Sequence, residues 1–176
     1  MALTARADWK ESPGHLVEMQ IAGGVTIYDG ALVGLATTAS ATSQGSVTNW
    51  LGTNEDLKFL GVARITPTSA DSTGDSVTGV TVTAIASVEL ATTIGVDISG
   101  VTLHEITLAA SGSLTTHIQI GSLVFGTDDN VITTAENVAG AIGWITKVYT
   151  AGIVDVKLFT PGEHLAGPNS AVWSAT

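Results

Sequence analysis

The sequence predicts a mainly β fold, a compact β-barrel or sandwich with an extended N-terminal arm and an inserted β lobe. Apolar residues recur along most of the chain with a period of two, the spacing of one face of a strand. Gly, Asp-Asn and Thr-Gly separate these apolar runs, and turns about every 8–12 residues favour a small sandwich or barrel over a parallel α/β sheet. Helix is scarce, and the best candidate, residues 134–139, is short.

Composition divides the chain into four parts. The polar leader contains Pro13-Gly14 and is too short for a core of its own, so we expect an extended arm that docks on a partner. The expected boundaries are 1–16 for this arm, 17–65 plus 113–160 for the core β domain, 66–112 for an inserted β segment or lobe, and 161–176 for the C-terminal tail.

Short apolar runs bounded by glycine predict the strands of the first half. These strands are expected at 15–21, 25–28, 31–33 and 59–65. The turns Gly23-Gly24 and Asp29-Gly30 separate the first three, because glycine tolerates the backbone angles of tight turns. Residues 36–57 are mostly small and polar, and a stretch of this length predicts a loop or an insertion.

Two hairpins are the clearest elements of the second half. Strands 123–125 and 131–134 flank turn-forming residues, and strands 142–149 and 153–159 flank Thr150-Ala151-Gly152. Earlier runs predict further strands, at 77–88, 94–98, 101–108 and 114–120. Val alternates with Thr and Ser in the first of these runs, which predicts one apolar and one hydroxyl-rich face.

The charge balance excludes several partners. Six Lys and Arg against 16 Asp and Glu give a net charge of −10 over 176 residues, which repels phosphate backbones and anionic lipid. We therefore expect no nucleic-acid and no membrane partner. The absence of cysteine excludes disulfides, thiolate metal clusters and cysteine nucleophiles.

The surface is expected to carry few charged side chains and therefore to lose its bound water easily. The chain is 44% hydrophobic and only 12% charged, so Ala, Thr, Ser and Gly must cover much of its surface. Such a surface favours a protein that packs against copies of itself or against a larger assembly. The N-terminus lacks the pattern of a secretory signal, and glycines and Asp29 interrupt the longest apolar region, 21–36, so we expect neither export nor a transmembrane helix.

Catalytic and metal-binding patterns are missing from the sequence. The four histidines are His15, His104, His117 and His164. They lack the spacing of helical metal motifs and are expected at the surface or at an interface, although the fold could bring two of them near Asp97 or Glu105. The run Asp128–Asn130 lacks the closing Glu of a known calcium loop and suits a hairpin tip. We expect no enzyme, no metal site and no cofactor.

The four tryptophans are candidate contact residues, because aromatic side chains are over-represented at interfaces. Trp144 lies in a predicted strand and is expected in the core. Trp9 lies in the arm, Trp50 in the long connection and Trp173 near the C-terminus. The expected interface residues are Leu3, Trp9, Trp50 and Trp173. For Trp9 and Trp173 the alternative is packing onto their own domain.

Five segments made of glycine-bounded strands follow one another in a recognisable order. They are AGGVTIYDGALV at 22–33, LGVA at 60–63, IGSLVFGTDDNVIT at 120–133, AIGWI at 141–145 and IVDVKL at 153–158. This order resembles that of tailed-phage capsid decoration proteins, also called cement or head-stabilisation proteins. The resemblance covers chiefly 17–35, 58–65 and 118–160. Segments 36–57 and 66–112 and the tail after Phe159 are longer than the family pattern.

The resemblance implies a non-enzymatic function. A protein of this family binds the exterior of a phage head at junctions between major capsid protein subunits and stabilises the shell. We therefore expect a homotrimer, made in the host cytoplasm and located on the virion. The alternative is a carbohydrate-binding or host-attachment β module of a virion. That function would need an exposed aromatic ring flanked by amide or carboxylate groups, which only Trp50, near Asn49 and Asn54, offers.

Overall fold

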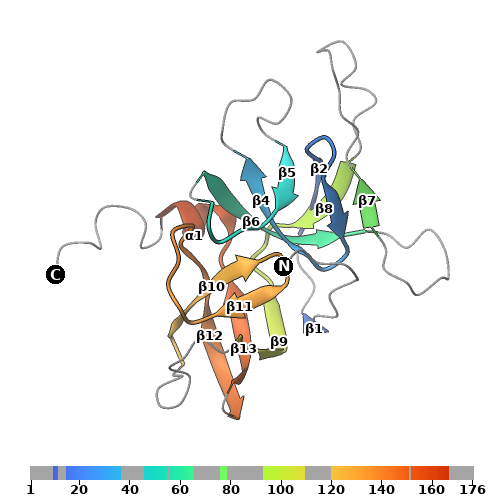
Figure 1. Cartoon of the computed structure of the whole chain (residues 1–176). Helices are drawn as coiled ribbons and strands as arrows, with labels where there is room; N and C mark the ends of the chain where they lie inside the picture. The colour runs from blue at the N-terminus through green and yellow to red at the C-terminus, as the bar shows by residue number, and fades with distance from the viewer. Residues whose placement is uncertain are drawn as a thin grey trace.

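In the computed structural model, most of the described residues lie in strands. The described residues are 10–11, 15–36, 46–54, 56–65, 76–78, 93–109, 120–150 and 152–166. They form three antiparallel sheets and one short helix, so the fold is mainly β (Figure 1). The described sheets do not form a closed barrel, and the arrangement is consistent with a β sandwich.

The five-stranded sheet lies in the upper half of Figure 1. Its strands, in spatial order, are β2 (Leu16–Gln20), β8 (Thr93–Asp97), β6 (Leu57–Arg64), β4 (Leu32–Ala36) and β5 (Val47–Asn49). Its two edges approach each other at one isolated parallel bridge between Ile21 and Val47. There the N–H of Ala22 donates to the carbonyl of Val47 at 2.9 Å. The sheet therefore curls strongly but stays open.

The six-stranded sheet lies in the lower half of Figure 1. Its strands, in spatial order, are β1 (Lys10–Glu11), β9 (Thr102–Thr107), β13 (Ile153–Leu158), β12 (Ala141–Thr150), β10 (Leu123–Asp128) and β11 (Val131–Thr133). This sheet also curls, because the N–H of Ala109, beyond the end of β9, donates to the carbonyl of Ile132 at 2.8 Å.

A small third sheet pairs β3 (Thr26–Tyr28) with β7 (Ser76–Thr78). The hydroxyls of Thr26 and Thr78, which are partners in this ladder, are 2.7 Å apart. Asn49 of β5 donates its amide to the carbonyl of Thr26 at 3.1 Å. The bond from Asn49 attaches the small sheet to the edge of the five-stranded sheet.

The main core lies between the two large sheets. From the five-stranded side it includes Leu32, Leu57, Phe59 and Val62, together with Trp50. From the six-stranded side it includes Val101, Leu103, Ile106, Val124, Ile132, Ile142, Ile145, Val154, Val156 and Leu158. Burial of these side chains is the main force that holds the sheets together. A second cluster, around Ile27, Val33 and Val96, fills the five-stranded sheet's other side.

Both predicted hairpins are confirmed. β10 pairs with β11 across a turn at Asp129 and Asn130, and β12 pairs with β13 across the residues just before Ile153. The predicted strands near 15–21, 25–28, 31–33 and 59–65 are also present. Local turn residues set these elements, which explains why the sequence reveals them.

Two predictions about the connections are wrong. The range 36–57, expected to be a loop or an insertion, contains β5 and the fully buried Trp50. The expected helix at 134–139 is a series of bends and turns, in which Ala135 donates its N–H to the Thr133 hydroxyl at 3.1 Å. The helix is instead α1 (Pro161–Ala166), in the expected tail.

The arm and the lobe contribute strands to the main sheets. β1 lies in the expected arm and pairs with β9, with Lys10 opposite His104 and Glu11 opposite Leu103. β8 and β9 lie in the expected lobe, yet β8 pairs with β2 and β6, and β9 pairs with β13. The described strands of 66–112, β7 apart, are thus integral parts of both large sheets. Residues 79–92 and 110–119, where further strands were expected, lie outside the described residues.

Candidate interaction surface

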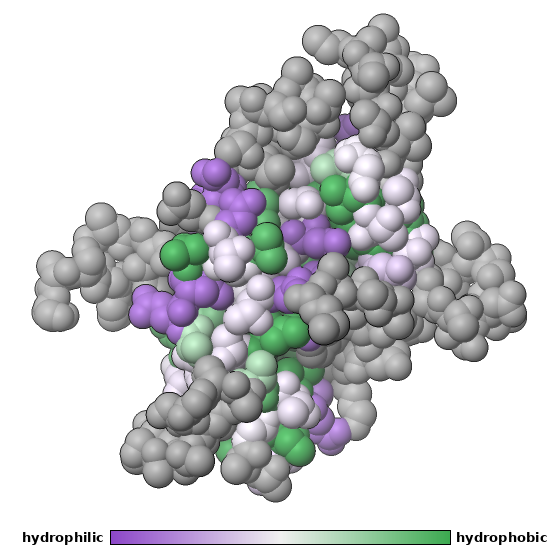
Figure 2. Space-filling view, viewed as in Figure 1, coloured by the Kyte–Doolittle hydropathy of each residue, from purple (hydrophilic) through white to green (hydrophobic). Residues whose placement is uncertain are grey.

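The first half of β2 is an exposed apolar edge. Leu16 is 61% exposed and Val17 is 39% exposed. Successive side chains of a strand point to opposite faces, so both faces of β2 are open at this end. Figure 2 shows hydrophobic surface, in green, over the region of β2 and β7 at the upper right. An apolar edge strand of this kind is a template for pairing with another chain.

The register shows which backbone groups of β2 point away from the sheet. The N–H of Ile98 donates to the carbonyl of His15 at 3.0 Å, so His15 belongs to the residues that bond toward β8. Inward and outward residues alternate along an antiparallel edge. Leu16 and Glu18 therefore direct their backbone N–H and carbonyl groups outward, where an added strand would bond. Beyond Gln20 the same edge meets β5 at the bridge between Ile21 and Val47.

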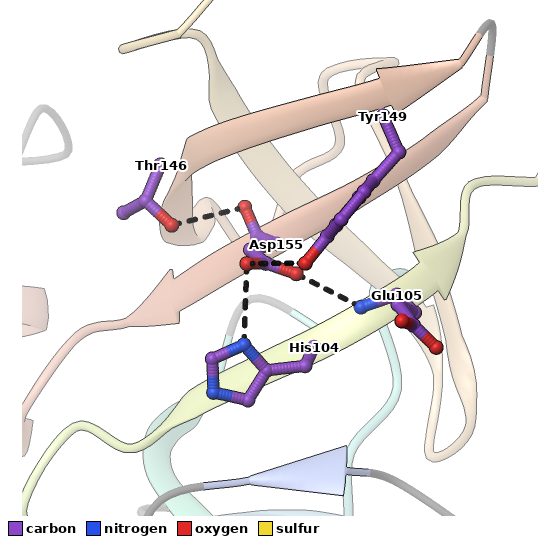
Figure 3. A network of polar contacts seen from close by, with 5 residues as sticks. All are labelled: His104, Glu105, Thr146, Tyr149 and Asp155. Atoms are coloured by element: carbon purple, nitrogen blue, oxygen red, sulfur yellow. Dashed lines mark hydrogen bonds and ion pairs between the residues drawn. The ribbon is translucent and has the colours of Figure 1, made fainter.

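A polar network on the outer face of the six-stranded sheet is centred on Asp155 (Figure 3). Its carboxylate accepts the N–H of Glu105 at 2.9 Å and the hydroxyl of Tyr149 at 3.1 Å, and it lies 3.2 Å from Nδ1 of His104. The neighbours of Asp155 in β13, Val154 and Val156, point into the core, so the Asp155 carboxylate is directed to the opposite face. Strands β9, β12 and β13 each supply part of this network.

The network keeps Asp155 ionised. Burial alone would raise the pKa of this carboxyl, but the hydrogen bonds from Glu105, His104 and Tyr149 and the charge of His104 hold its pKa below the ordinary value. The carboxylate fixes the His104 ring, with the Nδ1 proton directed at Asp155. The sequence left open that the fold brings His104 near Asp97 or Glu105; the structure places its Nδ1 beside Asp155, while Asp97 accepts the hydroxyl of Ser99 at 2.8 Å.

Glu105 has an unusual backbone conformation. Its φ is 54°, and it is the one non-glycine residue in the described ranges with positive φ. The left-handed region is costly for a residue with a side chain. The bond from its N–H to Asp155 stabilises this conformation, at the point where the ladder between β9 and β13 shifts register. The network therefore fixes the backbone conformation of β9 at Glu105, and it holds the His104 imidazole in one orientation on this face of the sheet.

An aromatic cluster lies on the same face of the sheet, beside the network. The rings of Trp144 and Phe159 are 5.3 Å apart between centroids, and Phe125 packs in the same cluster. Leu123 lies opposite Trp144 in the ladder and is 37% exposed. Trp144 is partly buried here, in contact with this small cluster rather than within the main core between the sheets.

His164 is not the surface or interface residue that the sequence suggested. It is 5% exposed and lies against the rings of Trp50 and Phe59. Burial, reinforced by the charge of Lys58, lowers the pKa of His164 to about 4. The imidazole is therefore neutral at pH 7. His15 is exposed, and His117 lies outside the described residues.

One expected contact residue must be reassigned. Trp50 is fully buried, and its indole N–H donates to the carbonyl of Gly126 at 2.8 Å, so it packs inside the protein and is unavailable as a surface anchor. The sugar-binding alternative depended on an exposed Trp50 and loses that basis. Leu3, Trp9 and Trp173 lie outside the described residues.

No family model, curated protein or solved structure matches this chain.

Within the described ranges, no group of three or more His, Cys, Asp or Glu is placed to hold a metal ion. The run Asp128–Asn130 forms the hairpin turn, with the N–H of Asp129 bonded to the Asp128 carboxylate at 2.9 Å. Among the described residues, no helix is long and apolar enough to cross a membrane.

Two features of the surface are not apparent from the sequence. The exposure of Leu16 and Val17 cannot be recognised in the sequence, because the alternating pattern of a strand does not indicate whether the strand lies at the edge of a sheet. The Asp155 network joins residues about fifty positions apart, with Glu105 and Asp155 separated by 50. A Val-Asp-Val run in β13, which places a carboxylate between two core residues, was the one local sign.

Proposed function

We propose that this protein is a non-enzymatic capsid decoration protein, which binds the exterior of a phage head at junctions between major capsid protein subunits. The order of its glycine-bounded strands, which resembles that family, is one basis for the proposal. The mainly β fold agrees with the expectation. A homotrimer attached to the capsid exterior, made in the host cytoplasm, is part of the same proposal.

The exposed edge of β2 is the observation that carries the proposal. Leu16 and Val17 expose apolar side chains on both faces, and Leu16 and Glu18 turn their backbone groups outward. A coat subunit that added a strand here would gain backbone hydrogen bonds and would cover the apolar side chains. Three such contacts in a trimer would reinforce one another, because the second and third become effectively intramolecular once the first has formed.

The acidic charge and the terminal residues fit the same function. A net charge of −10 suits the outer face of a shell, away from packaged DNA, and keeps unassembled subunits soluble. Leu3, Trp9 and Trp173 remain proposed contacts with the shell or with neighbouring copies. Partners with phosphate backbones or anionic surfaces are disfavoured by the same charge.

Co-sedimentation with undecorated phage heads tests the proposal directly. We expect the purified protein to pellet with the heads at saturable stoichiometry and to raise the temperature at which they rupture. Light scattering gives its mass in free solution, and electron microscopy of the decorated heads shows the occupied sites. Failure to bind heads at micromolar concentration, under conditions where the protein is folded, would overturn the proposed function.

A further inference from the structure

The helix α1 is attached to the junction of the two large sheets by a buried imidazole. His164 is 5% exposed, and its ring lies 5.9 Å from Trp50 and 6.0 Å from Phe59, between centroids. Trp50 is 0% exposed and Phe59 1%. The imidazole thus covers one side of an aromatic pair that belongs to the main core. α1 packs on β6, the strand that carries Phe59.

This site accepts the neutral imidazole and opposes its charged form. Neither ring nitrogen of His164 makes a well-formed hydrogen bond. The backbone of Ala139 faces the ring and favours its charged form, but burial and the charge of Lys58 outweigh this effect and lower the pKa. Burial of a charge without a partner costs far more than burial of a neutral ring. Lys58, the charged residue of β6 that acts on His164, adds repulsion to any positive charge. Glu163, on α1 itself, is exposed and its carboxylate is bonded to the N–H of Thr160.

We propose that α1 is an acid-released latch, in which protonation of His164 detaches the helix from β6 and uncovers Trp50 and Phe59. Detachment breaks few contacts, because α1 has only six residues. The two large sheets keep their shared core, since the strands and their ladders do not depend on the helix. The uncovered pair would add an apolar surface that the helix covers at neutral pH.

The direction of the pH effect follows from the two states of His164. In the attached helix its pKa is lowered from 6.5 to about 4, chiefly by burial and then by Lys58. In the detached helix the imidazole is in water and has its ordinary pKa, so the detached state binds the proton more tightly. Detachment becomes easier as the pH falls below about 6.5 and levels off below about 4. Linkage gives a change on the order of a hundredfold in the detachment equilibrium between pH 7 and pH 4.

Hydrogen exchange of single amides, followed by NMR and corrected for the intrinsic rate at each pH, tests the latch. The amide of His164 donates to the carbonyl of Thr160 at 2.9 Å and reports on α1. The amide of Ile145 donates to the backbone carbonyl of Ser122 at 2.9 Å and reports on the six-stranded sheet. We expect protection at His164 to fall by about a hundredfold from pH 7 to pH 4, while protection at Ile145 stays within about threefold. Equal loss at both amides would overturn the proposal, because it indicates global unfolding.

Two variants isolate the imidazole. His164→Phe keeps an aromatic ring in the site and should abolish the loss of protection at residue 164 on acidification. His15→Phe, at an exposed histidine remote from α1, is the matched control and should behave as the unmodified protein. If His164→Phe shows the same acid response as the control, the proposal is wrong.

A third variant keeps the test valid if His164→Phe does not fold. Lys58→Gln retains His164 and removes the charge that opposes its protonation. The attached state then tolerates the proton better, so the loss of protection at His164 between pH 7 and pH 4 should be smaller than in the unmodified protein. An unchanged or larger loss in Lys58→Gln, or no loss in the unmodified protein, would also overturn the latch.

Discussion

The indole N–H of Trp50 donates to the carbonyl oxygen of Gly126 at 2.8 Å, across the junction of the two large sheets. Trp50 follows β5 of one sheet, and Gly126 lies in β10 of the other. The same carbonyl accepts the side-chain amide of Asn137 at 2.9 Å. The N–H of Leu32 donates to the carbonyl of Asp129 at 2.7 Å close by. The sheets are therefore joined by specific hydrogen bonds as well as by apolar burial.

Gly126→Ala should destabilise this junction. A Cβ at position 126 would lie 2.6 Å from Cδ1 and Nε1 of Trp50, which is closer than packed atoms approach. The indole or β10 must shift, and overpacking of this kind costs about 1–3 kcal/mol of unfolding free energy. Urea denaturation measures the loss. Gly162→Ala is the control, because its nearest neighbour is 4.0 Å away and alanine favours a helix. Equal stability of the two variants would contradict this packing.

Asp155→Asn should reduce stability at neutral pH and weaken its dependence on acid. The pKa of Asp155 is lower in the folded protein than in the unfolded chain, so its contribution is present above about pH 4 and is lost as the pH falls through the folded pKa. We expect the variant to lose about 1–3 kcal/mol at pH 7, because hydrogen bonds to a charged group are removed. Its stability should then fall less between pH 5 and pH 3.

Urea denaturation at several pH values checks the effect of Asp155→Asn. Protonation of His164 acts equally in both proteins, so the difference between the two curves reports on Asp155 and the groups bonded to it. Glu136→Gln, at an exposed carboxylate, is the control and should leave the curve almost unchanged. Parallel curves for Asp155→Asn and the unmodified protein would show that the network does not depend on the charge.

Thr160→Ala should loosen α1 at all pH values. Thr160 and Glu163 form a reciprocal cap: the Thr160 N–H donates to the Glu163 carboxylate at 2.7 Å, and the Glu163 N–H donates to the Thr160 hydroxyl at 3.2 Å. Loss of such a cap costs about 1 kcal/mol, so the protection of the His164 amide at pH 7 should fall about fivefold. Glu163→Gln retains an acceptor and should lose less. A greater loss in Glu163→Gln than in Thr160→Ala would argue against the cap.

Local signals in the sequence predicted the elements that local chemistry sets. The hairpin of β12 and β13 follows from alternating apolar runs around a short turn with Gly152, whose φ of 86° suits glycine. The start of α1 also had a local signal, Thr160-Pro161-Gly162-Glu163, which combines a capping box with proline in the first turn. Sequence analysis treated those residues as tail and missed the helix.

Contacts between distant segments decided the rest of the fold and the candidate surface. Trp50 is separated from Gly126 by 76 residues, so nothing near position 50 distinguishes a buried indole from an exposed one. The lack of a side chain at Gly126 allows the Trp50 indole to approach β10 closely, but nothing in the sequence distinguishes this glycine from the glycines that lie in turns. The exposure of Leu16 depends in the same way on β2 being an edge strand, and only the order of the strands reveals this.

Leu16→Asp should weaken binding to phage heads without weakening the fold. The side chain of Leu16 is 61% exposed, so a charge there leaves the core intact and changes the free energy of unfolding by less than about 0.5 kcal/mol. At a docked edge, the buried carboxylate would lie without a partner, and we expect at least a tenfold loss of affinity. Val138→Asp is the matched control, because Val138 is 65% exposed but lies away from β2, between β11 and β12. Co-sedimentation over a range of protein concentrations measures both variants. Equal binding of Leu16→Asp and Val138→Asp would show that a capsid contacts some other part of the protein.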